Sequence, residues 1–270
     1  MFYKNLSPDE TCISDAVLSA YIPDVYEEIN INRKRPAVII CPGGGYTFRS
    51  RREAEPVALK LMAGGLNAFI LEYSVEPARY PVALGQLAAA VSYVRAHAEQ
   101  YHTISDRIIV CGFSAGGHLC ANYGVSWQRD DLFPEFDREA RRPNGMILSY
   151  PVITLKKETH AGSRMALLGR KEKDEQLLND TATDELVTDL TPPAFIWHTF
   201  DDQAVPVSNS LRFACAMNRA GVSTELHIFP HGRHGMSLAT DQSDDLQDAI
   251  AEGKNISCWA DMAIRWAREL

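Results

Sequence analysis

The chain has 270 residues and a net charge of −8, with 46% hydrophobic and 23% charged residues. Such a length can bury a sizeable core, and α/β folds often form one domain of this size, so we expect a single domain over residues 1–270. The acidic balance disfavours nucleic acid as a partner, because phosphate binding needs concentrated Lys and Arg. No stretch approaches the roughly 18 apolar residues of a membrane span, so no membrane partner is expected.

The first ten residues, Met1–Glu10, lack the basic segment followed by an apolar run that is typical of a signal peptide. A cytoplasmic location is therefore the expectation. If the chain assembles, a homodimer is the expected form, because dimers are the commonest assembly.

Short apolar runs alternate with longer helical patterns, which is typical of α/β proteins with a mostly parallel sheet. Several apolar runs are continuous, as expected for strands that helices cover on both faces. The predicted strands are Ala16–Tyr21, Ala37–Cys41, Asn67–Tyr73, Arg107–Cys111, Gly145–Tyr150, Ala194–His198 and Thr224–Phe229. The predicted helices are Glu53–Met62, Pro81–Glu99, Ala115–Ser126, Ser208–Ala220 and Ile256–Glu269.

The first motif in chain order is Pro42-Gly43-Gly44-Gly45-Tyr46, directly after a predicted strand. Three glycines let the backbone turn its N–H groups into a pocket. The loop lacks the G-x-G-x-x-G spacing and the Gly-Lys-Ser/Thr ending of phosphate-binding loops, which disfavours a nucleotide site. From the loop alone, a plain turn and an oxyanion-binding loop remain open.

The second motif, Gly112-Phe113-Ser114-Ala115-Gly116, lies between a predicted strand and a predicted helix. A serine at such a turn is held in strained geometry with its hydroxyl exposed above the sheet. The helix N-terminus favours developing negative charge beside it. We therefore predict that Ser114 is a nucleophile and that the N–H of Ala115 is one oxyanion donor, with a second donor from the glycine loop.

The charged segment 154–189 interrupts the alternation of strands and helices. One interpretation is a solvated loop with one or two helices. The other is a small cap over the active site, because loops beyond strand ends often carry function in such folds. Both interpretations can hold.

An acid and a base should follow the serine in the chain order Ser, Asp or Glu, His. Asp201 and Asp202 follow a predicted strand, and spacing does not choose between them. The other member is expected to cap the next helix. His231 and His234 both lie in a loop beyond the last strand, from which a general base can reach Ser114.

The remaining histidines have no such placement and are expected to be structural or solvated; they are His97, His102, His118, His160, His198 and His227. The sequence has no metal-binding pattern such as H-E-x-x-H. We therefore expect neither a metal nor another cofactor.

The glycine loop, the Gly-Phe-Ser-Ala-Gly-Gly-His sequence, the segment His198–Pro206 and Gly232-Arg233-His234-Gly235 together resemble the esterase/lipase branch of the α/β-hydrolases. More narrowly, they are similar to small acetyl-esterase and acetylxylan-esterase-like proteins, over nearly the whole chain. The resemblance implies the α/β-hydrolase fold, with helices on both faces of a mostly parallel sheet and a small cap insertion.

The resemblance also implies roles for individual residues. In the family's Asp-Asp-x-x-Val-Pro motif the first acid is catalytic, which matches Asp201, and in its Gly-x-His-Gly motif the histidine is the base, which matches His234. The second and third loop glycines, Gly44 and Gly45, match the oxyanion donors, although the loop begins with Pro42 where the lipase-type loop has His.

The implied activity is that of a serine esterase acting on short-chain acyl esters, with acetylated sugars or xylan fragments as the family-based substrate class. One alternative is a small serine peptidase or amidase, because prolyl-oligopeptidase-type enzymes share a similar Asp-Asp-x-Val-Val-Pro segment. Another is a non-catalytic ligand-binding protein on the same scaffold.

Overall fold

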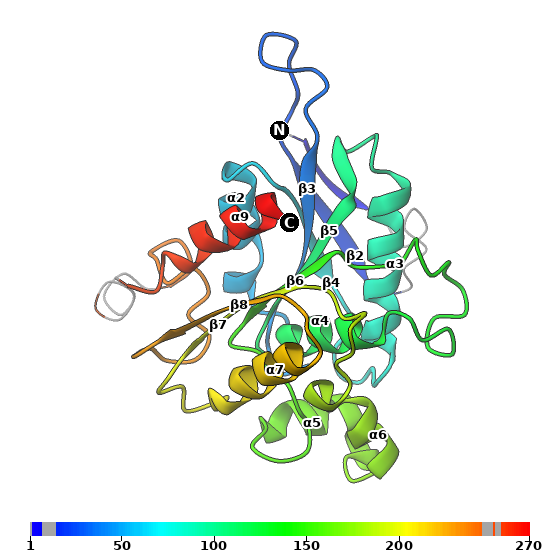
Figure 1. The fold of residues 1–270 in the computed structure, drawn as a ribbon, viewed down its shortest axis with the longest axis vertical. Helices are drawn as coiled ribbons and strands as arrows, with labels where there is room; N and C mark the ends of the chain where they lie inside the picture. The colour runs from blue at the N-terminus through cyan, green and yellow to red at the C-terminus, as the bar shows by residue number, and fades with distance from the viewer. Residues whose placement is uncertain (1, 7–14, 245–250, 252–254) are drawn as a thin grey trace.

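The computed structural model is organised around one eight-stranded sheet, with the strand order β1-β2-β4-β3-β5-β6-β7-β8 (Figure 1). It describes residues 2–6, 15–244, 251 and 255–270. The expectation about a signal peptide rests on Met1–Glu10, and about half of these residues lie outside the described part of the chain. The strands are β1 Phe2–Leu6, β2 Val17–Ile22, β3 Arg35–Cys41, β4 Asn67–Glu72, β5 Thr103–Phe113, β6 Gly145–Ser149, β7 Ala194–Thr199 and β8 Thr224–Phe229.

The six strands from β4 to β8 along the sheet pair in parallel, whereas β1 and β2 pair antiparallel at one edge. Parallel strands put all their carboxyl ends at one edge, where the connecting loops can form a common site. The seven predicted strands are all present, with β5 longer at both ends. The edge strand β1 was not predicted, because Phe-Tyr-Lys-Asn-Leu is short and mixes polar with apolar residues.

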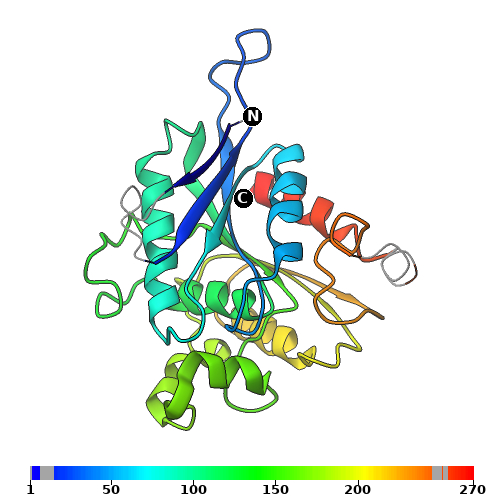
Figure 2. The same cartoon turned by 180° about the vertical axis from the view of Figure 1, so that it is seen from behind.

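Helices cover both faces of the sheet, which confirms the predicted α/β architecture (Figures 1 and 2). One apolar core joins the sheet to α2 and α9, and the other joins it to α3, α4 and α7. The helices are α2 Glu55–Ala63, α3 Val82–Ala96, α4 Ala115–Ser126, α5 Ala161–Leu168, α6 Glu175–Asp180, α7 Ser208–Arg219 and α9 Trp259–Glu269, with 3-10 turns at Arg51–Glu53, Gly169–Lys171 and Thr183–Glu185.

Three helix starts differ from the prediction, and that of α3 differs by one residue, since this helix begins at Val82 and not at Pro81. A 3-10 turn ends at Glu53, and α2 begins only at Glu55, with Pro56 in its first turn. Proline favours the first helical turn, because its missing N–H has no partner there in any case. The last helix begins at Trp259 and not at Ile256.

The segment 154–189 forms α5, α6 and two 3-10 turns beside α4 and α7 (Figure 1). Two hydrogen bonds attach it to α4: the Nδ2 of Asn122 donates to the carbonyl of Asp180, and the Nε2 of His118 lies 3.0 Å from the carbonyl oxygen of Thr181. Helices are therefore present in this segment, as one interpretation required.

Within the described part of the chain, no helix is long and apolar enough to cross a membrane.

Candidate active site

Ser114 occupies the sharp turn between β5 and α4, as the sequence predicted. Its backbone angles, φ 52° and ψ −114°, are strained for a residue with a side chain. The surrounding backbone holds this geometry: the N–H of Ser114 donates to the carbonyl of Ser149, and its carbonyl accepts from the N–H groups of His118 and Val152. Ser114 is only 7% exposed, and it lines a pocket and does not stand on an open surface.

His234 contacts Ser114 directly. Its Nε2 lies 2.7 Å from the Oγ of Ser114, and its Nδ1 lies 2.7 Å from Oδ2 of Asp202. A carboxylate only accepts, so Nδ1 carries the proton and Nε2 is left to accept the hydroxyl proton of Ser114. Of the two candidate histidines, the structure therefore brings His234 to the serine.

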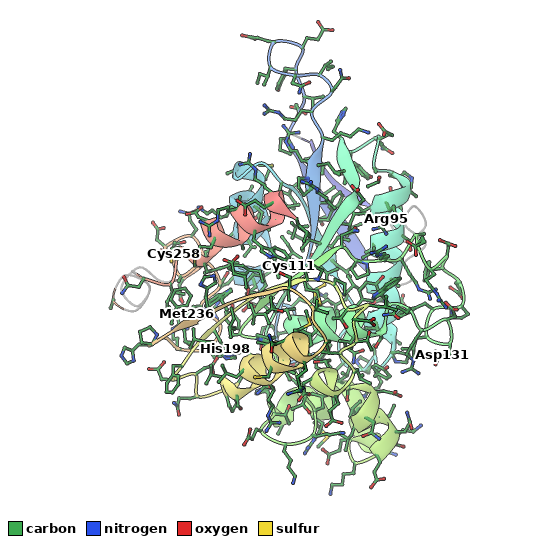
Figure 3. The ribbon with its side chains drawn as sticks, viewed as in Figure 1. Arg95, Cys111, Asp131, His198, Met236 and Cys258 are labelled. Atoms are coloured by element: carbon green, nitrogen blue, oxygen red, sulfur yellow. The ribbon has the colours of Figure 1, made fainter. Side chains whose placement is uncertain are left out.

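Asp202 has a buried side chain behind His234. Its Oδ1 accepts the N–H groups of Ala204 and Val205, and its Oδ2 also lies 3.3 Å from the Nε2 of His198. His198 lies at the carboxyl end of β7, in the lower part of Figure 3. Burial alone would raise the pKa of Asp202, but the hydrogen bonds from His198 and His234 hold it well below its usual value. The carboxyl group therefore stays ionised at neutral pH.

The prediction that Asp201 is the acid is wrong for this geometry. Asp201 is exposed, and its Oδ2 lies 3.0 Å from the Nδ1 of the exposed His231, while its Oδ1 accepts the N–H of Gly232. Consecutive residues after β7 point in different directions, so only Asp202 faces His234. Asp201 instead fixes the loop that carries the histidine.

The glycine loop lies against the turn that carries Ser114. The N–H of Gly43 is engaged by Oε2 of Glu53 at 2.8 Å, which leaves Gly44 and Gly45 as the next N–H groups along the loop. Gly44 has φ 124°, a conformation that a residue with a side chain rarely adopts. Gly44 and Gly45 both line the pocket that contains Ser114 and His234.

That pocket has a volume of about 290 Å³. Besides the residues already named, it is lined by Phe48, whose side chain is exposed, by Arg52, and by His160 and Gly162 from the segment 154–189. The segment therefore contributes two residues to the wall of the candidate site.

His160 is a residue whose position the sequence did not reveal, since it was expected to be structural or solvated. It precedes α5, and its Nδ1 accepts the N–H of Ser163. A neutral ring bound in this way carries its proton on Nε2, which is then a donor. Burial first, and then the charge of His234, lower the pKa of His160, which favours this neutral form.

Glu53 is a second such residue, a buried carboxyl group at the pocket wall that contacts the glycine loop. By contrast, His118 is buried and structural, as expected, whereas the buried His198 contacts the candidate acid Asp202. Burial lowers the pKa of His118 to about 4, so this histidine remains neutral between Tyr46 and Thr181. Among the residues that the structure describes, no three His, Cys, Asp or Glu side chains are grouped so as to hold a metal ion.

Comparison with known proteins shows which family the chain belongs to. The model of the BD-FAE family matches residues 23–217. The chain is 36% identical to the endo-1,4-beta-xylanase B of Butyrivibrio fibrisolvens over 82% of its length, and 30% identical to the acetylxylan esterase of Xylanibacter ruminicola over 88%. It spans only 36% and 46% of those two proteins.

A solved structure is similar over nearly its full length. The acetyl ester-xyloside bifunctional hydrolase of Caldicellulosiruptor lactoaceticus superposes with a TM-score of 0.83 at 36% identity, covering 98% of this chain and 94% of that one. An α/β-hydrolase from a Medee basin deep-sea metagenome library superposes with a TM-score of 0.79 at 33% identity, covering 100% of this chain and 97% of that one, which confirms the predicted α/β-hydrolase fold.

Proposed function

Because the chain belongs to the BD-FAE family and has the α/β-hydrolase fold, we propose that it is a serine carboxylic-ester hydrolase that acts on short-chain acyl esters. The observation that carries the proposal is the continuous chain of contacts from the Oγ of Ser114 through both ring nitrogens of His234 to the carboxylate of Asp202. The names of the relatives, among them an acetylxylan esterase, support an ester as the substrate.

The mechanism follows from the direction of each hydrogen bond. Ser114 attacks the ester carbonyl while Nε2 of His234 takes its proton, and the ionised Asp202 stabilises the imidazolium that forms. The negative charge on the carbonyl oxygen is bound by the N–H groups of Ala115 and of Gly44 or Gly45. His234 then protonates the leaving alcohol and activates a water molecule, which releases the acid and restores Ser114.

A fluorophosphonate probe tests this proposal, since its phosphorus reacts with an activated serine and loses fluoride. We expect one equivalent of probe per chain, located by mass spectrometry on the peptide that contains Ser114, and no labelling of Ser114→Ala. Turnover of p-nitrophenyl acetate should be lost in the same variant. Absence of labelling would instead favour a ligand-binding protein, and faster cleavage of aminoacyl-nitroanilides than of esters would favour a peptidase.

For the substrate class, we propose acetylated sugars or xylan fragments. The pocket volume of about 290 Å³ is near the lower end of the range for small-molecule sites, which fits a small ester. The exposed ring of Phe48 offers an apolar surface for a sugar ring, and Nε2 of His160 offers a hydrogen-bond donor for a hydroxyl. Two of the relatives are named for xylan or its acetyl esters.

The variant His160→Ala tests the role of the cap in this recognition. We expect KM for acetylated xylo-oligosaccharides to rise by about 3- to 10-fold, which is the range for losing one hydrogen bond between neutral groups. The KM for p-nitrophenyl acetate, which has no sugar hydroxyl, should change by less than about 2-fold. Steady-state kinetics on both substrates make the comparison, and an equal change on both would argue against hydroxyl recognition by His160.

A further inference from the structure

Glu53 is a buried carboxyl group beside the candidate site for which the mechanism above has no role. Its side chain is only 3% exposed. Its Oε2 accepts the N–H of Gly43 at 2.8 Å, and its Oε1 accepts the hydroxyl of Tyr150 at 2.7 Å. One carboxylate therefore joins the glycine loop after β3 to the residue that follows β6.

Tyr150 extends this connection to the histidine loop. Its hydroxyl accepts the N–H of Ser237, three residues beyond His234, at 2.9 Å. The rings of Tyr150 and His234 meet edge to face, with 5.0 Å between their centroids. Tyr150 itself has φ 38°, which is unusual for an aromatic residue, and its N–H donates to the carbonyl of Trp197. The ring is thus held firmly against the candidate base.

Keeping a carboxyl group in this position is costly. Burial raises the pKa of Glu53, and the hydrogen bonds from Tyr150 and Gly43 and the charge of His234 oppose that rise. Buried, perturbed acids of this kind concentrate at functional sites.

We propose that Glu53 is a positioning residue, which holds the oxyanion loop through Gly43 and the histidine loop through Tyr150 at a fixed separation. This inference rests on the proposed esterase function. The N–H groups of Gly44 and Gly45 act as donors only if they lie within hydrogen-bond distance of the oxyanion. The position of Gly43 sets the positions of these two glycines, because they follow it directly in the chain. Glu53 then supports catalysis without touching the substrate.

The variant Glu53→Gln tests the proposal with little change of shape. The amide keeps one acceptor oxygen but replaces the other with a donor group, so it can accept from only one of Gly43 and Tyr150. Removing an oxyanion donor outright costs about 10²- to 10³-fold in kcat, so misplacing one should cost about 10- to 100-fold. We expect that fall in kcat for p-nitrophenyl acetate, with KM changed by less than about 2-fold.

Tyr150→Phe is a second test of the proposal, because it removes the hydroxyl that Glu53 contacts and keeps the ring against His234. It should show the same loss in kcat at nearly constant KM. Both variants break the same connection between the oxyanion loop and the histidine loop. The kcat of the double variant should therefore be no lower than that of the slower single variant. Additive losses, or an unchanged kcat in both single variants, would overturn the proposal. Should Glu53→Gln not fold, Tyr150→Phe alone decides by its kcat.

A matched control lies two residues away. The hydroxyl of Tyr21 donates to Oε1 of Glu55 at 3.1 Å, and neither residue lines the pocket. Glu55→Gln and Tyr21→Phe should therefore keep the wild-type kcat, and equal losses there would show that the effect of Glu53 is only structural. Failure of the proposed function is distinguishable, because the wild-type chain would then take up no fluorophosphonate; that result would overturn both proposals.

Discussion

Asp202→Asn is expected to lower kcat/KM for p-nitrophenyl acetate by about 10⁴-fold, the loss seen when a triad aspartate becomes an amide. The reason is the tautomer of His234. With the carboxylate present, the proton resides on Nδ1 and Nε2 accepts from Ser114. An amide can donate to Nδ1, which moves the ring proton to Nε2 and removes the acceptor that Ser114 needs.

Asp201→Asn is the matched control for this prediction. In this variant Oδ1 can still accept the N–H of Gly232, and the neighbouring His231 is exposed. The kcat/KM for p-nitrophenyl acetate should therefore change by no more than about 3-fold. Steady-state kinetics of both variants, with circular dichroism to verify folding, give the comparison. A 10⁴-fold loss in Asp201→Asn together with an active Asp202→Asn would contradict the geometry described above.

The error over this acid shows what a single sequence can and cannot provide. Continuous apolar runs identified seven strands. The strand-to-helix setting of Ser114 predicted the candidate nucleophile, and the family resemblance pointed to His234, which the structure brings to that serine. The choice between Asp201 and Asp202, however, depends on which way each side chain points after β7. That direction is set by the turn in which Oδ1 of Asp202 accepts two backbone N–H groups, and the adjacent letters in the sequence do not encode it.

Glu53 and His160 could not be found from the sequence for a different reason. Glu53 contacts Tyr150, which is 97 positions away, and His160 reaches the pocket from a charged segment with no apolar periodicity. Helical and strand periodicities report only which face of an element is buried. They carry no information about which two loops meet at the carboxyl edge of a sheet.

Gly116→Ala is expected to destabilise the fold by about 3 kcal/mol, at the upper end of the usual cost of overpacking a dense interior. A Cβ on Gly116 would lie 2.0 Å from the carbonyl oxygen of Cys41 and 2.6 Å from that of Pro42. Both contacts are with backbone, which cannot rotate away as a side chain can. For a chain of this size, such a loss lowers Tm by roughly 6–12 °C, which calorimetry would measure.

Gly85→Ala is the control, because Gly85 lies inside α3 and a Cβ there would meet nothing within 4 Å. Alanine is the better helix former, so this variant should gain about 0.5–1 kcal/mol. Equal Tm values for the two variants would contradict the close approach of α4 to β3. That approach also matters for the reaction, because Cys41 and Pro42 lead directly into the glycine loop. A Cβ on Gly116 would push that loop away from Ser114, and the residual activity of any folded Gly116→Ala should fall together with its stability.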